Sequence, residues 1–153
     1  MENKIIIGSD HGGFDLKQEI IAFLQNDMKY EVQDMGCYDK NSVDYPDIAE
    51  TVCNEVKKSG LYGILICGTG IGISISANKI NGIRCALCSD EYSAKMTRHH
   101  NDANVLALGG RTVGPELAKS IVQTFLTNDF DGGRHEKRVN KIKLLEEKQT
   151  GSK

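Results

Sequence analysis

Short apolar runs alternate with stretches of helical periodicity along most of the chain. Five runs rich in β-branched residues predict strands at Lys4–Ser9, Tyr30–Met35, Tyr62–Cys67, Ile83–Ser89 and Val105–Gly109. Between them, apolar residues recur every three or four positions and predict helices with inward faces at Leu16, Ile20, Phe23 and Leu24, at Ile48, Val52 and Val56, and at Leu117, Ile121, Val122 and Phe125. Two prolines, Pro46 and Pro115, stand where first-turn prolines belong and indicate two helix starts.

The alternation of strands and helices predicts right-handed βαβ units. Such units form a parallel sheet that helices cover on both faces, and the continuous apolar run Ile64–Ile66 suits its central strand. After Gly132-Gly133, the pattern predicts a final helix over Arg138–Lys148, with Val139, Ile142 and Leu145 on its apolar side, and a frayed tail over 149–153. We therefore expect one domain over residues 1–153, an α/β/α sandwich with a five-stranded parallel sheet and a C-terminal helix.

Composition narrows the classes of function. The chain has 19 Lys and Arg against 21 Asp and Glu, so its net charge of −2 provides no basic field for nucleic acid. No apolar run approaches the roughly 20 residues that a membrane span requires. The first residues show no signal-peptide pattern, and the five cysteines have no disulfide-scaffold spacing. We expect a cytoplasmic protein without a nucleic-acid or membrane partner.

Residues suited to ligand binding follow two of the predicted strands. In sheets of this type, ligands bind outside the carboxyl ends of the strands. The first strand ends in Ser9–Gly13, and the third ends in Cys67–Gly72, with Ser74 shortly after. A glycine loop that opens a helix offers backbone N–H groups to an anion and favours the thiolate form of a nearby thiol. Cys67 is therefore a candidate base or nucleophile, although a tight turn beside a buried structural cysteine gives the same pattern.

Two further groups carry candidate chemistry. Neighbouring helical residues do not share a face, so His99 and His100 together predict no metal site, and one of them serves as an acid or base or as a partner of the helix dipole. Arg134 and Arg138 are four residues apart and share a face, which suits a bound dianion or a solvated basic surface. Arg111 is a third candidate for anion binding.

The pair Cys85 and Cys88 matches a C-x-x-C pattern but lies within a predicted strand. Residues three apart in a strand point to opposite faces of the sheet, and no second pair of ligands completes a zinc site. We interpret both cysteines as packing residues.

Five motifs in the chain resemble those of the type B ribose-5-phosphate isomerases and the related galactose-6-phosphate isomerase subunits. They run in family order over about residues 4–145 and are Gly8-Ser9-Asp10-His11-Gly12-Gly13, Asp44-Tyr45-Pro46, Ile66-Cys67-Gly68-Thr69-Gly70-Ile71-Gly72-Ile73-Ser74, His100-Asn101-Asp102-Ala103-Asn104-Val105, and Gly132-Gly133-Arg134-His135 with Arg138. The resemblance implies a Rossmann-like homodimer, or dimer of dimers, that interconverts ribose 5-phosphate and ribulose 5-phosphate without a metal or other cofactor.

The same resemblance implies roles for individual residues. Cys67 matches the base that moves the proton between C1 and C2, and Asp10 and His100 match residues that help to open the sugar ring. Thr69 is a further catalytic candidate, and the backbone from Gly68 to Gly72 matches the cradle for the enediolate. The substrate or phosphate contacts are expected at His11, Tyr45, Gly68, Thr69, Gly70, Ile71, Gly72, Ser74, Asn101, Arg111, Arg134 and Arg138. Some relatives carry a glutamate base at the position of Ile71, so this chain resembles the cysteine branch.

Topology predicts that each active site is shared between two subunits. Cys67 ends the third strand, whereas His100 precedes the fifth strand, so the two residues should lie at opposite edges of the sheet. A two-fold dimer would bring His100 of one chain to Cys67 of the other.

Other functions remain open at this point. Within the family, a hexose 6-phosphate such as allose or galactose 6-phosphate is the main alternative substrate. Gly68–Gly72 after a strand, with Asp90 about 20 residues further on, resembles part of a nicotinamide-binding fingerprint, but the third glycine is not at its usual place. A non-catalytic phosphosugar-binding module would carry the same anion site with an inert Cys67.

Overall fold

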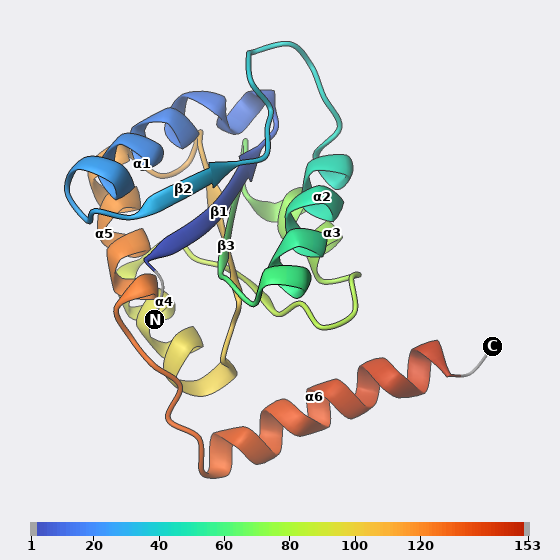
Figure 1. Ribbon diagram of the computed structural model, residues 1–153. Coiled ribbons are helices and arrows are strands. Elements are labelled where there is room, and N and C mark those ends of the chain that lie inside the picture. Colours follow the sequence, from blue (N-terminus) through green and yellow to red (C-terminus); the bar gives the residue numbers. More distant parts are fainter. Residues whose placement is uncertain (1–2, 152–153) are drawn as a thin grey trace.

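A computed structural model describes residues 3–151, which form a five-stranded parallel sheet between two layers of helices (Figure 1). The strands lie in the order β2-β1-β3-β5-β4, and every neighbouring pair is parallel. The strands are β1 (Lys4–Ser9), β2 (Glu31–Asp34), β3 (Gly63–Cys67), β4 (Cys85–Leu87) and β5 (Val105–Gly109). The helices are α1 (Phe14–Asn26), α2 (Tyr45–Ser59), α3 (Ile71–Ala77), α4 (Glu91–Met96), α5 (Pro115–Leu126) and α6 (Arg134–Thr150). The predicted fold class is confirmed.

Two apolar cores, one on each face of the sheet, hold the layers together. Ile5 and Ile7 pack with residues of α1, α4 and α5, whereas Ile6 between them packs with residues of α2 and α3. This alternation follows from the two-residue period of a strand. Every residue of the central strand β3 is buried, as its apolar run predicted. Cys85 and Cys88 contribute to opposite cores, which confirms their interpretation as packing residues.

The last helix differs most from its prediction. It begins at Arg134, directly after Gly132 and Gly133, which both have positive φ, and it continues through Thr150. The helix therefore includes residues 149 and 150, which the pattern placed in the tail, and residues 152–153 lie outside the described part of the chain. Val139 is buried, but Ile142 and Leu145 on the predicted apolar side are 45% and 59% exposed.

The position of α6 explains this exposure. The helix runs away from the sheet and its covering layers (Figure 1), and Glu146 fixes its far half by accepting two hydrogen bonds from the Gly82 N–H, at 3.0 and 3.1 Å. Leu117 on α5 is also more open than its periodicity predicts, at 39% exposure. Among the helices of residues 3–151, none is both long and apolar enough to cross a membrane.

Candidate active site

Asp10 lies at the carboxyl edge of the sheet, directly after β1. Its side chain accepts hydrogen bonds from the N–H groups of Gly12 and Gly13, at 2.9 and 3.1 Å. Its own N–H donates to the carbonyl of Ile66 in β3, at 3.1 Å. Asp10 is 6% exposed, and these bonds hold the carboxylate in one orientation beside the end of β3.

Cys67 ends β3 and is 4% exposed. The Gly70 N–H donates to its Sγ at 3.1 Å, so a backbone donor points at the thiol from the loop that opens α3. Gly70 has φ of +78°, and a Cβ there would lie 2.8 Å from the carbonyl carbon of Leu108 in β5. Only glycine allows this close approach. Donation by an N–H at a helix start stabilises negative charge on sulfur, which a proton-abstracting thiol needs.

His11 and Tyr45 border the same edge. The Val43 N–H donates to His11 Nδ1 at 3.3 Å. Because a backbone N–H can only donate, Nδ1 is the acceptor in this arrangement, and Nε2 is the ring nitrogen left for a ligand. Tyr45, at the start of α2, packs its ring so closely on Gly72 that a Cβ there would lie 2.6 Å from the ring. The His11 imidazole and the Tyr45 ring thus both lie where a ligand at this edge would contact them.

The loop after β5 also lies at the carboxyl edge of the sheet, beside Cys67 and Gly68. The Gly110 N–H donates to the carbonyl of Cys67 at 2.8 Å, and the Arg111 N–H donates to the carbonyl of Gly68 at 2.9 Å. The Arg111 guanidinium reaches back over Gly68, with Nη1 3.2 Å from the place of a Cβ at that glycine. The residue is exposed, so its charge is available to an anion at this edge.

Three other predicted residues lie on the loop or on α3. Thr69 is exposed, and its Oγ1 accepts from the Ile71 N–H at 3.2 Å. Ile71 is 51% exposed and offers an apolar side chain to whatever binds there. The Ser74 hydroxyl, in contrast, donates to the carbonyl of Ile71 at 2.8 Å and is buried. The structure therefore gives Ser74 a partner within its own helix.

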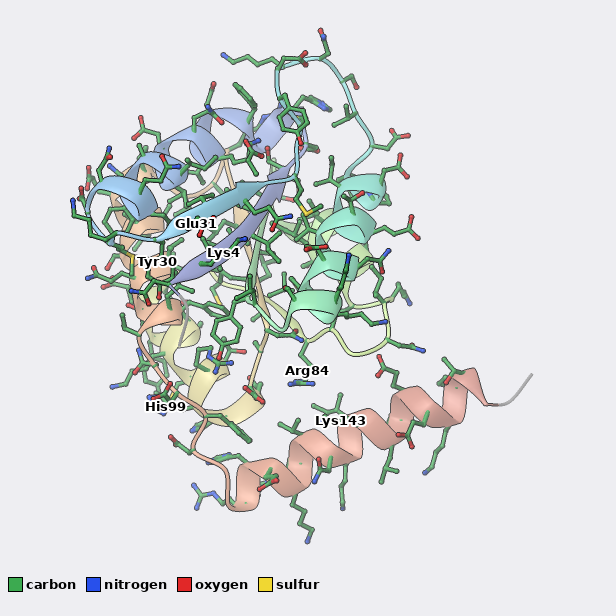
Figure 2. All side chains as sticks on the ribbon, in the orientation of Figure 1. Lys4, Tyr30, Glu31, Arg84, His99 and Lys143 are labelled. Atoms are coloured by element: carbon green, nitrogen blue, oxygen red, sulfur yellow. The ribbon has the colours of Figure 1, made fainter. Side chains whose placement is uncertain are left out.

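The remaining predicted residues lie near the opposite, amino edge. His100 and Asn101 belong to a π-helical turn, Thr97–Asn101, and His100 stacks on His135 with ring centroids 4.2 Å apart and planes 10° apart. The connection to α6 packs against this turn, because the Asp131 N–H donates to the His99 carbonyl at 3.1 Å. Figure 2 shows His99 beside this connection and Arg84 directed toward α6.

Arg134 and Arg138 are exposed on the first turns of α6. They therefore belong with His100 rather than with Cys67. The strand register gives the distance between His100 and Cys67 along the sheet. Val105, which begins β5, pairs with Gly63, and Gly109, which ends β5, pairs with Cys67 four residues further along β3. That register corresponds to about 13 Å between the two edges. Within one chain, the predicted residues thus form two groups at opposite edges of the sheet.

Sequence reasoning missed Lys17, which is fully buried on α1. Its Nζ contacts Asp34 Oδ1 at 2.7 Å and the carbonyl of Cys37 at 2.5 Å. It thereby fixes the start of the connection that leads from β2 to Val43 and α2. The periodicity held a signal, because Lys17 precedes Ile20 by three residues and so shares the apolar face of its helix.

Arg98, 2% exposed, was also missed. Its guanidinium binds Asp102 Oδ1 at 3.0 Å, the Ala103 carbonyl at 2.6 Å and the Tyr62 hydroxyl at 2.5 Å. It also donates to the carbonyl of Asn128, at 3.2 Å. Arg98 therefore joins the π-helical turn that carries His100 to the segment that precedes α6.

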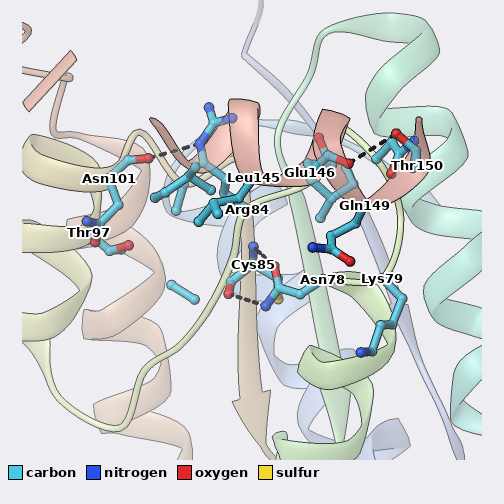
Figure 3. A pocket seen from close by; sticks show the side chains of 15 residues that line it. Asn78, Lys79, Arg84, Cys85, Thr97, Asn101, Leu145, Glu146, Gln149 and Thr150 are labelled. Atoms are coloured by element: carbon cyan, nitrogen blue, oxygen red, sulfur yellow. Dashed lines mark hydrogen bonds between the residues drawn. The ribbon is translucent and has the colours of Figure 1, made fainter. Parts of the chain in front are cut away.

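A cavity of about 780 Å³ lies elsewhere, between α6 and the β4 side of the molecule (Figure 3). Asn78 and Cys85 line it from the body, and Leu145 and Glu146 line it from α6. It does not include Cys67. Asp90, weighed above as a nicotinamide-site acid, instead caps α4 by accepting from the N–H and hydroxyl of Ser93, and these bonds lower its pKa.

Comparison with known proteins assigns the family. The family model described as ribose/galactose isomerase matches residues 5–142. Ribose-5-phosphate isomerase B of Escherichia coli is 50% identical over 147 residues, which cover 95% of this chain and 98% of that protein. D-erythrulose-4-phosphate isomerase of Pectobacterium atrosepticum is 45% identical over 148 residues, which cover 95% of this chain and 96% of that protein.

Solved structures agree with the sequence comparisons. Ribose-5-phosphate isomerase B of Clostridium thermocellum superposes with a TM-score of 0.93 at 55% identity, covering 95% of this chain and 99% of that chain. The type B ribose 5-phosphate isomerase of Trypanosoma brucei superposes with a TM-score of 0.90 at 44% identity, covering 95% and 99%. These matches span nearly the whole chain, and they decide against an oxidoreductase or a non-catalytic module. The chain belongs to the ribose/galactose isomerase family.

Proposed function

We propose that this isomerase interconverts D-ribose 5-phosphate and D-ribulose 5-phosphate through an enediolate, with Cys67 as the base. The observation that carries the proposal is the Gly70 N–H donating to Cys67 Sγ at 3.1 Å, beside a glycine loop with further N–H donors. The relatives named ribose-5-phosphate isomerase B support the choice of substrate.

The reaction moves one proton between adjacent carbons. After ring opening, in which Asp10 and His100 assist, the Cys67 thiolate removes the proton from C2 of the aldose, and the electron pair forms the C1–C2 double bond of the enediolate. N–H groups of Gly68–Gly72 stabilise the developing oxyanion, with Thr69 beside them. Cys67 then returns its proton to C1, and the O2 proton moves to the O1 oxyanion as the ketone forms at C2.

Binding of the phosphate orients the sugar for this transfer. Arg134 and Arg138 are suited to hold a dianion by charge-assisted hydrogen bonds. His11, Tyr45, Asn101 and Arg111 supply the remaining substrate contacts. Interactions with the non-reacting phosphate contribute to catalysis because they position C1 and C2 against the base.

We infer that two chains build each site. Cys67 and His100 lie at opposite edges of one chain, about 13 Å or more apart along the strands, so one open-chain sugar does not reach both. A two-fold homodimer, or a dimer of such dimers, brings His100 and the α6 arginines of one subunit to Cys67 of the other.

The first test compares Cys67→Ala with Cys88→Ala, which removes a buried thiol from the core beneath the sheet. Loss of the base should lower kcat by about 10²–10⁴-fold or more while leaving substrate binding largely intact. The control should keep its turnover. Near-normal kcat in Cys67→Ala would overturn the assignment, and assays with allose, galactose and D-erythrulose phosphates would identify another preferred substrate.

The second test mixes inactive Cys67→Ala and His100→Ala chains and lets them reassemble. A hybrid dimer has one site with both defects and one with neither, so equal mixing should restore roughly a quarter of wild-type activity. Hybrid dimers verified by mass that remain inactive would place the whole site within one chain.

A further inference from the structure

Three side chains with metal-binding atoms converge between the π-helical turn and the start of α6. His100, Asp131 and His135 each offer one ligand atom, and these atoms all lie within 4.8 Å of one another. His100 reaches the group from the turn, and the glycines before α6 fold the chain back so that His135 stacks against it. Sequence reasoning did not find this group, because only the adjacent pair His99 and His100 stood out.

An outer shell of hydrogen bonds holds the carboxylate in place. His99 Nδ1 lies 2.5 Å from Asp131 Oδ1, and His99 Nε2 lies 3.0 Å from Asn128 Oδ1. The Asp131 N–H also donates to the His99 carbonyl. Metal ligands in proteins are oriented by outer-shell bonds of this kind.

We propose that His100, Asp131 and His135 bind a divalent transition-metal ion of the zinc class. Two imidazole nitrogens and one carboxylate oxygen match the ligands of Zn²⁺, whereas Mg²⁺ and Ca²⁺ take oxygen ligands. The three side chains are exposed or half-buried, which lets the stacked rings turn toward a common ion. Three protein ligands leave a fourth position open, and the charges of Arg134 and Arg138 oppose tight binding. The site therefore suits reversible occupancy rather than a structural ion.

Occupancy has a consequence for catalysis that rests on the proposed function. When an ion is bound to His100, the imidazole nitrogen that binds it can no longer transfer a proton during ring opening. The ion also places positive charge where the sugar phosphate enters. Zinc should therefore inhibit the isomerase reversibly.

The binding test needs no activity measurement. Zinc is titrated into the tag-free, metal-free full chain against a chromophoric chelator, and one ion per chain is expected. Loss of the outer-shell residue in His99→Ala should weaken binding by about 10–100-fold, and loss of a ligand in His135→Ala by at least as much. Glu31→Ala, which removes an exposed carboxylate from β2, should bind as wild type. Absence of binding, or unchanged binding in His135→Ala, would overturn the proposal.

The activity test separates this site from the proposed reaction. Zinc inhibition should be reversed by EDTA, and His135→Ala should need at least about tenfold more zinc for the same inhibition. Zinc that binds with the expected mutational pattern but does not inhibit would confirm the metal site and overturn the role of His100. Inhibition that His135→Ala does not change would place the inhibitory ion elsewhere and overturn this proposal.

Discussion

Replacing Lys17 by methionine removes a positive charge from a position that water does not reach. The side chain of Lys17 is 0% exposed, and its ammonium lies 2.7 Å from Asp34 Oδ1. It also contacts the Cys37 carbonyl and lies near the rings of Phe14 and Tyr38, with centroids at 5.4 and 5.6 Å. Methionine has a similar length and fills the apolar part of the space, so the change isolates the charge and its hydrogen bonds.

The expected loss of stability follows from the Asp34 carboxylate, which remains without its cationic partner. Removing one partner of a buried ion pair costs about 3–5 kcal/mol, because the other charge stays desolvated. Asp34 is 29% exposed and keeps part of its hydration, so we expect the lower end, about 3 kcal/mol. For a chain of this size, that loss corresponds to a fall in Tm of about 6–12 °C.

Urea unfolding and thermal unfolding, followed by circular dichroism, measure this loss. Lys4→Met is the matched control, because the Lys4–Glu31 pair is open, with side chains 32% and 75% exposed, and its loss should cost less than about 1 kcal/mol. Lys17→Met should also raise KM, since Lys17 fixes the connection that brings Val43 to His11. A loss in Lys17→Met no larger than that in Lys4→Met would refute the reasoning.

Three further predictions concern the site and the core. Arg134→Ala should raise KM for the sugar phosphate by about 10–100-fold and leave KM for the free sugar nearly unchanged. Lys137→Ala on the same helix should change neither KM. Equal effects of Arg134→Ala on both sugars would contradict a phosphate contact. Gly70→Ala places a Cβ 2.8 Å from the backbone of β5, so the loop must shift and kcat should fall without a matching loss of Tm; unchanged kcat would contradict the donor role of the loop. Burial raises the pKa of Cys53 to about 12, so peptide mapping after alkylation near pH 8 should find this thiol unmodified until the chain is denatured.

The layer architecture could be predicted because it depends on periodicities that are local in the sequence. Ile5, Ile6 and Ile7 read as one apolar run, and a strand sends such a run alternately into two cores. The helix starts at Pro46 and Pro115 were also predictable, because proline favours the first turn. The exposure of Ile142 was not predictable, because periodicity identifies an apolar helix face but does not indicate whether the same chain covers that face.

The two buried cations show where sequence reasoning about the site ended. Lysine and arginine are usually exposed, so Lys17 and Arg98 drew no attention, although each fixes a segment next to a candidate site residue. Lys17 could have been found from its place on an apolar helix face. Arg98 could not, because its partners come from Asp102 and Ala103 directly after the π-helical turn, from Tyr62 before β3 and from the segment at Asn128. A π-helical turn adds a residue to the local period and has no simple sequence pattern.

The proposed dimer would account both for the divided site and for the exposed apolar face of α6. Arg134 and Arg138 stand on the first turns of α6, and the same helix leaves Ile142, Leu144 and Leu145 at 45–59% exposure further along. A chain alone keeps this apolar surface in water and leaves the two halves of the site at opposite edges. Covering the surface with a second copy would gain about 25 cal/mol for each Å² of apolar area buried. Because the arginines move with the helix, the association that buries α6 would also set the phosphate contacts against the partner's edge. Assembly and catalysis would then depend on the same contacts, so a change that weakens the dimer should lower activity even where no site residue is touched.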